Sequence, residues 1–173
     1  MALTRARPVF GSPAARAAVT GVIAEVLEGA RPERDLPAEA ATMRADMARH
    51  KPPAGPLDAK LLPGGLVDLE FTVHLAQLLH RSGFDPDLRV AIPALTAAGA
   101  LPDGLLTAHD LLTRLLVTLR LVAPDAQEPP PATQVLIARA LRLPDWPAVL
   151  AAFAATRQEV EAVWRGMTGG CDG

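Results

Sequence analysis

The sequence predicts an all-α protein, a helical bundle of about six or seven helices. Half of its 173 residues are hydrophobic, yet only 3% are aromatic. A core of Leu, Val and Ala is typical of packed helices, because Ala and Leu are strong helix formers. Apolar residues also recur at helical spacing in one segment after another. Many of the 17 prolines stand where these segments begin, and proline fits the first helical turn.

The first helix is predicted from Ser12, which caps it, to about Leu27. Pro13 occupies the first helical position, and Gly29 ends the helix. Apolar residues at helical spacing share one face, which amphipathic helices turn toward the core. These residues are Val19, Ile23, Val26 and Leu27.

A second helix is predicted over about residues 37–49. Its pattern places Met43 and Met47 inward and Arg44 outward. The proline-rich stretch 51–56 ends this helix and predicts a stiff, exposed linker.

The third helix, at about residues 66–81, is apolar nearly all round, which is typical of a central helix in a bundle. Residues 57–62 before it alternate apolar and charged side chains, so a short β-hairpin near 57–66 is compatible with the pattern. Gly64 and Gly65 predict a turn between the two segments.

Further helices complete the predicted bundle. We expect them at about residues 85–95, 103–122, 133–141 and 145–165, with Asp103 and Asp145 as caps. The predicted organisation is an N-terminal part with the linker (1–56), the helical bundle proper (57–168) and a disordered tail (169–173).

Composition excludes several classes of function. The formal net charge of −2 gives no general attraction to nucleic acid or to an anionic membrane, so neither is expected as a partner. No apolar run reaches the roughly 18 residues that a membrane span needs. The N-terminus does not resemble a signal peptide. A single cysteine, Cys171, fits a reducing compartment, and the sequence therefore predicts a cytoplasmic protein.

Residues 58–70 contain more charged side chains than a structural turn requires. They combine a lysine, three carboxylates and two glycines: Asp58, Lys60, Gly64, Gly65, Asp68 and Glu70. Burying such charges is costly unless each has a partner. In a structural interpretation, Asp68 and Glu70 cap the third helix and pair with Lys60. In a functional one, the charges serve chemistry, and the residue types alone leave both open.

Other candidates are weaker. His74 and His80 lie six residues apart on a predicted helix and cannot comfortably share a metal, so we expect them to be structural. Arg5 and Arg7 either belong to a solvated helix end or reach an anion.

The string Asp58-x-Lys60-x-x-x-Gly64-Gly65-x-x-Asp68-x-Glu70-Phe71 resembles the motif that opens the helical domain in glutamine synthetase adenylyltransferases. These are bifunctional bacterial enzymes that attach AMP to glutamine synthetase and remove it. The segments 2–11 and 43–50 are also similar to the family, so the resemblance covers nearly the whole chain and is tightest over residues 1–80.

The resemblance implies the helical domain that follows the C-terminal nucleotidyltransferase module, in a fragment of a longer enzyme or a truncated gene product. It implies a role in ATP-dependent AMP transfer to a tyrosine of glutamine synthetase. ATP and magnesium would be cofactors of the parent enzyme, with none held by this chain alone. The family holds magnesium with an Asp-x-Asp pair after a Gly-Ser turn, and we expect no such pair here. The chain alone is therefore expected to be inactive and to contain no catalytic or metal-binding residue.

The resemblance also implies roles for single residues. Lys60 would face the nucleotide phosphates or a catalytic carboxylate, Gly64 and Gly65 would allow close backbone approach, and Asp68 and Glu70 would fix that geometry. The remaining candidates that support the active site are Asp58, Arg5 and Arg7. Expected partners are glutamine synthetase, the upstream nucleotidyltransferase module and a nitrogen-signalling regulatory protein. The alternative is a non-catalytic helical module that binds a protein or senses a regulator.

Overall fold

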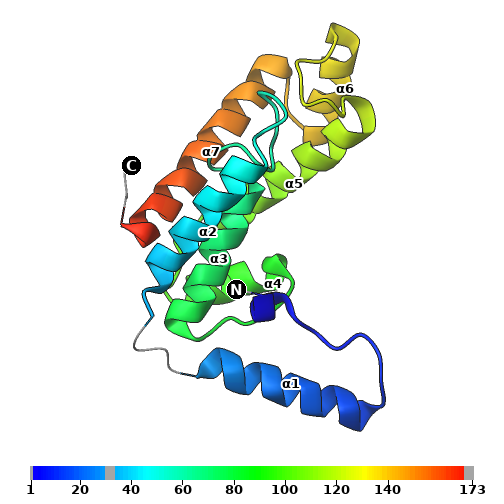
Figure 1. Ribbon diagram of the computed structural model, residues 1–173. Coiled ribbons are helices and arrows are strands. Elements are labelled where there is room, and N and C mark those ends of the chain that lie inside the picture. The colour runs from blue at the N-terminus through cyan, green and yellow to red at the C-terminus, as the bar shows by residue number, and fades with distance from the viewer. Residues whose placement is uncertain (1, 30–33, 170–173) are drawn as a thin grey trace.

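The computed structural model describes residues 2–29 and 34–169, where seven α-helices follow a short 3-10 helix (Figure 1). The 3-10 helix, η1, is Ala2–Arg5. The α-helices are α1 (Pro13–Glu28), α2 (Leu36–His50), α3 (Leu66–His80), α4 (Leu88–Ala97), α5 (Leu105–Val122), α6 (Pro131–Leu141) and α7 (Trp146–Thr168). The expectation of an all-α bundle of six or seven helices is confirmed.

Helix α3 lies at the centre of the bundle, as its apolar sequence predicts. It packs against α2, α4, α5 and α7, and it runs beside α2 and α7 in Figure 1. Eleven of its 15 residues are buried, including Leu69 and Val73, which are fully inaccessible. Because this helix has no solvent face along most of its length, any polar residue on it needs a partner within the protein.

Helices α5, α6 and α7 pack against one another, and α5 and α7 also contact α3. The start of α7 follows the prediction, since the Asp145 carboxylate accepts a hydrogen bond from Ala148 N at 2.8 Å. The prediction that Asp103 caps α5 is wrong. The N-cap is Gly104, with φ +97° and no side-chain cap bond, so this backbone turn starts the helix one residue later.

Two side chains of α2 face the opposite way from the one that the sequence pattern predicts. Arg44 is buried, at 9% exposure, whereas Met43 is 52% exposed. Arg44 lies one turn after the buried Ala40, on the face that meets α3. The side chain turns inward because Asp68 of α3 is buried there and requires a cation.

No strand is present in the part of the chain that the structure describes, so the hairpin considered near 57–66 is not formed. The segment 57–65 is a series of turns. Its carbonyl groups fold back onto the start of α3 and are therefore not available to a neighbouring strand.

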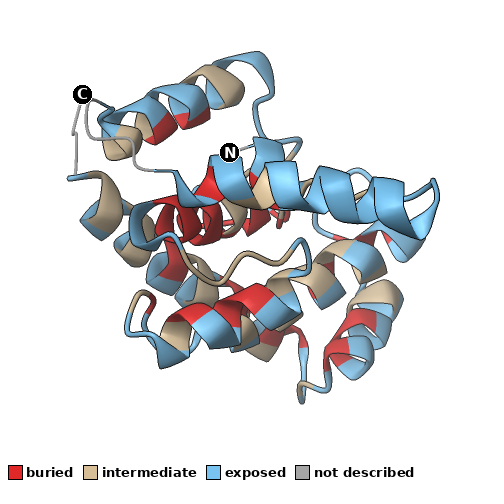
Figure 2. Ribbon diagram, turned by 90° about the horizontal axis from the view of Figure 1, so that it is seen from below, coloured by how far each residue is buried: buried red, intermediate tan, exposed pale blue. Residues whose placement is uncertain are grey.

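Helix α1 lies at the edge of the molecule, away from the other helices in Figure 1, and is exposed along most of its length in Figure 2. Of its predicted inward face only Leu27 is buried, while Val19 and Val26 are 48% and 45% exposed. The predicted tail beyond Gly169 lies outside the described residues. Within the described ranges, no helix combines the length and hydropathy that crossing a membrane requires.

Candidate functional site: the loop before α3

Asp58 organises the loop that precedes α3. One carboxylate oxygen, Oδ1, accepts hydrogen bonds from the backbone N–H groups of Lys60 and Leu61, both at 3.0 Å. The other, Oδ2, accepts from Ala54 N at 3.0 Å. This is a local turn stabilised by its own side chain. Both oxygens of Asp58 are therefore engaged by the backbone.

The same loop caps the start of α3 with backbone carbonyls. The bonds run from Gly65 N to Leu62 O (2.8 Å), from Leu66 N to Ala59 O (2.9 Å) and from Val67 N to Lys60 O (3.1 Å). A Cβ on Gly65 would lie 2.8 Å from the carbonyl oxygens of Ala59 and Leu62, so a side chain does not fit. Free N–H groups at a helix start can bind phosphate, but here three of them are already satisfied.

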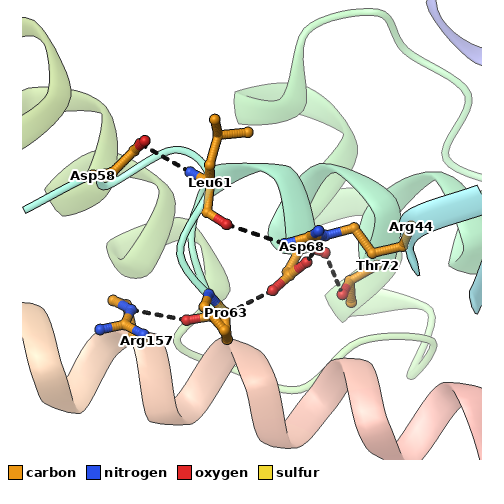
Figure 3. A network of polar contacts seen from close by, with 8 residues as sticks. Arg44, Asp58, Leu61, Pro63, Asp68, Thr72 and Arg157 are labelled. Atoms are coloured by element: carbon orange, nitrogen blue, oxygen red, sulfur yellow. Dashed lines mark hydrogen bonds and ion pairs between the residues drawn. The ribbon is translucent and has the colours of Figure 1, made fainter. Parts of the chain in front are cut away.

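Asp68 forms a buried ion pair with Arg44, which joins three segments (Figure 3). Its side chain is 5% exposed and that of Arg44 is 11% exposed. Oδ1 accepts from Arg44 Nε, and Oδ2 accepts from Gly64 N at 2.6 Å. Arg44 Nη2 also donates to Leu61 O at 3.3 Å. The pair thus ties α2 to the loop and to α3.

Gly64 brings the loop against the backbone of α7. Its φ is +72°, and a Cβ there would overlap the carbonyl group of Arg157. Arg157 in turn donates from Nε to Pro63 O at 2.8 Å, and its guanidinium lies 5.3 Å from the centre of the Phe153 ring. The close approach that both glycines permit is therefore an approach to this chain's own backbone.

Lys60 is the charged residue of the loop that the protein leaves free. Its ammonium group has no hydrogen bond or ion pair with any described residue, and the side chain is half-buried. The structural interpretation, in which Lys60 pairs with Asp68 or Glu70, is wrong. Arg44 and Gly64 take the Asp68 carboxylate, and the ion-pair partner of Glu70 is Arg5, with Nη1 and Oε2 4.0 Å apart.

The predicted site residues lie in three places. Asp58, Lys60, Gly64, Gly65 and Asp68 lie in the loop and the first turn of α3. Glu70 is two positions further, about 200° around the helix, where it meets Arg5 of η1. Arg7 is exposed and lines a pocket between η1 and α1. The structure therefore does not bring the two arginines to the loop.

A pocket of about 370 Å³ lies beside the loop, between α2 and α7. Arg44 and Asp68 are among its lining residues, and Trp164 of α7 forms part of its wall. Trp164 also packs edge-to-face on Phe71 with 5.9 Å between ring centres. A second ion pair, Arg165 Nη2 to Glu161 Oε1 at 2.8 Å, lines the same pocket. Charge in this pocket is thus balanced within the protein.

One Asp-x-Asp pair does occur in the sequence, at Asp85 and Asp87, so the expectation of none is wrong. Asp85 Oδ1 accepts from the backbone N–H of Asp87 at 2.7 Å, and Asp87 Oδ1 caps α4 through Arg89 N at 2.9 Å. These carboxylates stabilise a turn and a helix start. Among the described residues, no group of three or more metal-ligating side chains gathers.

His74 is a buried polar residue at the centre of α3. Its Nδ1–H donates to Gln77 Oε1 at 2.9 Å, and Gln77 Nε2 donates to Gly83 O at 2.8 Å. Its Nε2 has no hydrogen-bond partner among the described residues. Burial, opposed by the Gln77 bond, lowers the pKa of His74 below its usual 6.5. The structural role expected for His74 agrees with this packing.

The lowered pKa of His74 predicts a pH dependence of stability. Below about pH 6.5 the unfolded chain takes up a proton that the folded chain resists, so the free energy of unfolding should fall as pH falls. Urea unfolding at pH 7.5 and 5.5 measures this loss. His74→Gln should reduce it, whereas His80→Gln, an exposed position on the same helix, should leave it unchanged. Equal pH dependence in all three proteins would contradict the prediction.

No protein-family model and no solved structure matches the chain. It is 36% identical over 154 residues to the bifunctional glutamine synthetase adenylyltransferase/adenylyl-removing enzyme of Brucella suis biovar 1, a match covering 84% of this chain and 16% of that protein. The enzymes of the same name from Caulobacter vibrioides and Rhodopseudomonas palustris are each 33% identical, and each match covers 98% of this chain and 18% of the relative.

The chain therefore spans less than a fifth of the length of these curated relatives. The resemblance drawn from the loop motif is confirmed, because the homology extends over most of the chain. In sequence, this helical bundle is a homologue of one segment of the glutamine synthetase adenylyltransferases.

Proposed function

We propose that the chain is a helical segment that supports ATP-dependent AMP transfer to glutamine synthetase within a longer adenylyltransferase. The observation that carries the proposal is the free Lys60. The loop carboxylates Asp58 and Asp68 are bound by groups of this chain, whereas the Lys60 ammonium has no described partner. A half-buried cation held on a rigid loop without a counter-charge suits a site completed by an anion from outside the chain.

AMP transfer places negative charge on the phosphate oxygens of the nucleotide, and a fixed cation nearby stabilises it. In this proposal Lys60 faces those oxygens or a catalytic carboxylate. ATP and magnesium are held by the upstream nucleotidyltransferase module. Asp58, the two glycines and the Arg44–Asp68 pair support the position of Lys60, because they fix the loop onto α2, α3 and α7. Glu70 with Arg5, and Arg7, belong to a second contact with the same module.

The proposal also names the surroundings of the site. Glutamine synthetase provides the tyrosine that receives AMP, a nitrogen-signalling protein regulates the enzyme, and the reaction takes place in the bacterial cytoplasm. The names of the relatives support the first of these partners, since they are glutamine synthetase adenylyltransferases.

The chain alone should transfer no AMP. In its Asp-x-Asp pair, Asp85 and Asp87, one oxygen of each carboxylate accepts a bond from a backbone N–H group, and among the described residues no three metal-ligating side chains gather. Incubation with labelled ATP, magnesium and glutamine synthetase measures this directly, with the full-length enzyme as the positive control. Label on glutamine synthetase from the chain alone would show that the chemistry lies inside this bundle.

A further inference from the structure

A smaller pocket, of about 200 Å³, lies between the loop that carries Lys60 and the C-terminal end of α5. Most of its lining is apolar and comes from both sides: Leu57, Leu61, Leu116, Leu119, Ala123 and Pro124. Two cations, Lys60 and Arg120, line it as well. The cavity is thus mostly apolar with a few charged groups, and its volume suits a ligand of only a few non-hydrogen atoms.

The two cations of this pocket have no direct ion-pair partner in the part of the chain that the structure describes. Neither Lys60 nor Arg120 forms an ion pair or side-chain hydrogen bond with a described residue. Asp58 is the carboxylate among the described lining residues, and its oxygens accept three backbone hydrogen bonds. Lys60, Arg120 and Asp58 together leave the lining with one excess positive charge, which favours an anion as the ligand.

The walls of the pocket are held together across a long stretch of sequence. Leu57 N donates to Ala126 O at 3.1 Å, and Gln127 Nε2 donates to Ala54 O at 3.2 Å. Ala126 has φ +58°, a left-handed conformation that costs energy for a residue with a Cβ. A Cβ on Gly55 would lie 2.5 Å from Ala126 O, so the two loops meet without room for a side chain. The two loops that flank the cavity are therefore joined in close backbone contact.

We propose that this pocket binds a small organic anion, with its oxyanion between Lys60 and Arg120 and its apolar body among the leucines. Charge-assisted hydrogen bonds from the two cations fix the head group, and burial of the body supplies the apolar contribution. A short aliphatic carboxylate has this chemistry. The inference concerns binding by this chain and holds whether or not Lys60 takes part in AMP transfer.

The test uses hexanoate as the probe and amide NMR spectra of the whole chain. Saturable shifts are expected at residues 54–61 and 119–126, and uncharged hexanol should bind more weakly. Lys60→Met and Arg120→Met should each weaken hexanoate binding about fivefold, the most that a partly exposed ion pair supplies, and should leave hexanol unchanged. Arg114→Met is the matched control, because Arg114 is exposed on α5 and does not line this pocket.

Lys60→Arg and Arg120→Lys should bind nearly as the unchanged protein does, which separates loss of charge from damage to the fold. Shifts that do not saturate, shifts centred on other residues, or equal affinity for hexanoate and hexanol would overturn the proposal. None of these results depends on turnover. A failure here is therefore distinct from a failure of the proposed role in AMP transfer, which is measured in the full-length enzyme.

Discussion

Arg44→Met should lower the free energy of unfolding by about 3 to 5 kcal/mol, because it leaves the buried Asp68 carboxylate without its cation. The Arg44 guanidinium also holds Leu61 O, so the loop loses an anchor to α2 at the same time. Asp68→Asn should cost a similar amount. If the side-chain oxygen of the new asparagine keeps the hydrogen bond from Gly64 N, its NH₂ group faces the Arg44 guanidinium. The guanidinium is then buried without an acceptor.

Helix α2 offers a matched control for this measurement. Arg49 pairs with Asp46 three residues away, but both side chains are at least half exposed, so Arg49→Met should cost less than about 1 kcal/mol. Urea unfolding of the three variants gives the comparison. The double variant Arg44→Met/Asp68→Asn should cost less than the sum of the single changes, because no buried charge remains. If Arg44→Met is as mild as Arg49→Met, the pair does not hold the fold.

In a full-length enzyme that carries this segment, Lys60→Ala should reduce AMP transfer about a hundredfold or more. A fixed cation near developing phosphate charge in a water-poor site is worth about 3 kcal/mol. Stability should change little, since Lys60 Nζ has no partner among the described residues to lose. Turnover with labelled ATP and urea unfolding of the same variants separate the two effects.

Lys60→Arg is the sharper variant, because a site fitted to a compact ammonium should not accept a planar guanidinium. Lys51→Ala is the control, since Lys51 is the other lysine of the chain and is exposed at the end of α2. We expect Lys51→Ala to keep full turnover. Wild-type turnover in both Lys60 variants would show that Lys60 is not needed for AMP transfer and would remove the support for the proposed function.

Local signals in the sequence predicted most of the helices correctly. Ser12 and Asp145 cap their helices as expected, because an N-cap depends on residues within one turn. The prediction that Asp103 caps α5 was wrong, because the helix begins at the backbone turn of Gly104, which has a positive φ. The residue types near a helix start therefore predicted the N-cap correctly, except where the backbone conformation of a glycine moved the start of the helix.

The loop motif was recognisable from its residues, but the ion pair between Asp68 and Arg44 was not. Arg44 lies 24 positions before Asp68, and nothing in the rhythm of α2 distinguishes it from a surface arginine. The signal that could have found it is the carboxylate in an otherwise apolar helix, which demands a cation from a neighbouring helix. The hairpin near 57–66 failed for a related reason, since its alternating pattern does not reveal that its carbonyls cap α3.

The contact between the loop and α7 also has a consequence for the order of synthesis. Pro63 O accepts its hydrogen bond from a residue 94 positions later, and Gly64 packs against the backbone of that same residue. During translation α2, α3 and the loop emerge long before α7 exists, and contacts between such distant residues form late. The segment that bears Lys60 can therefore reach its final shape only after Arg157 has been synthesised, so a ribosome that stalls before Arg157 leaves the motif complete in sequence but without its contact to α7.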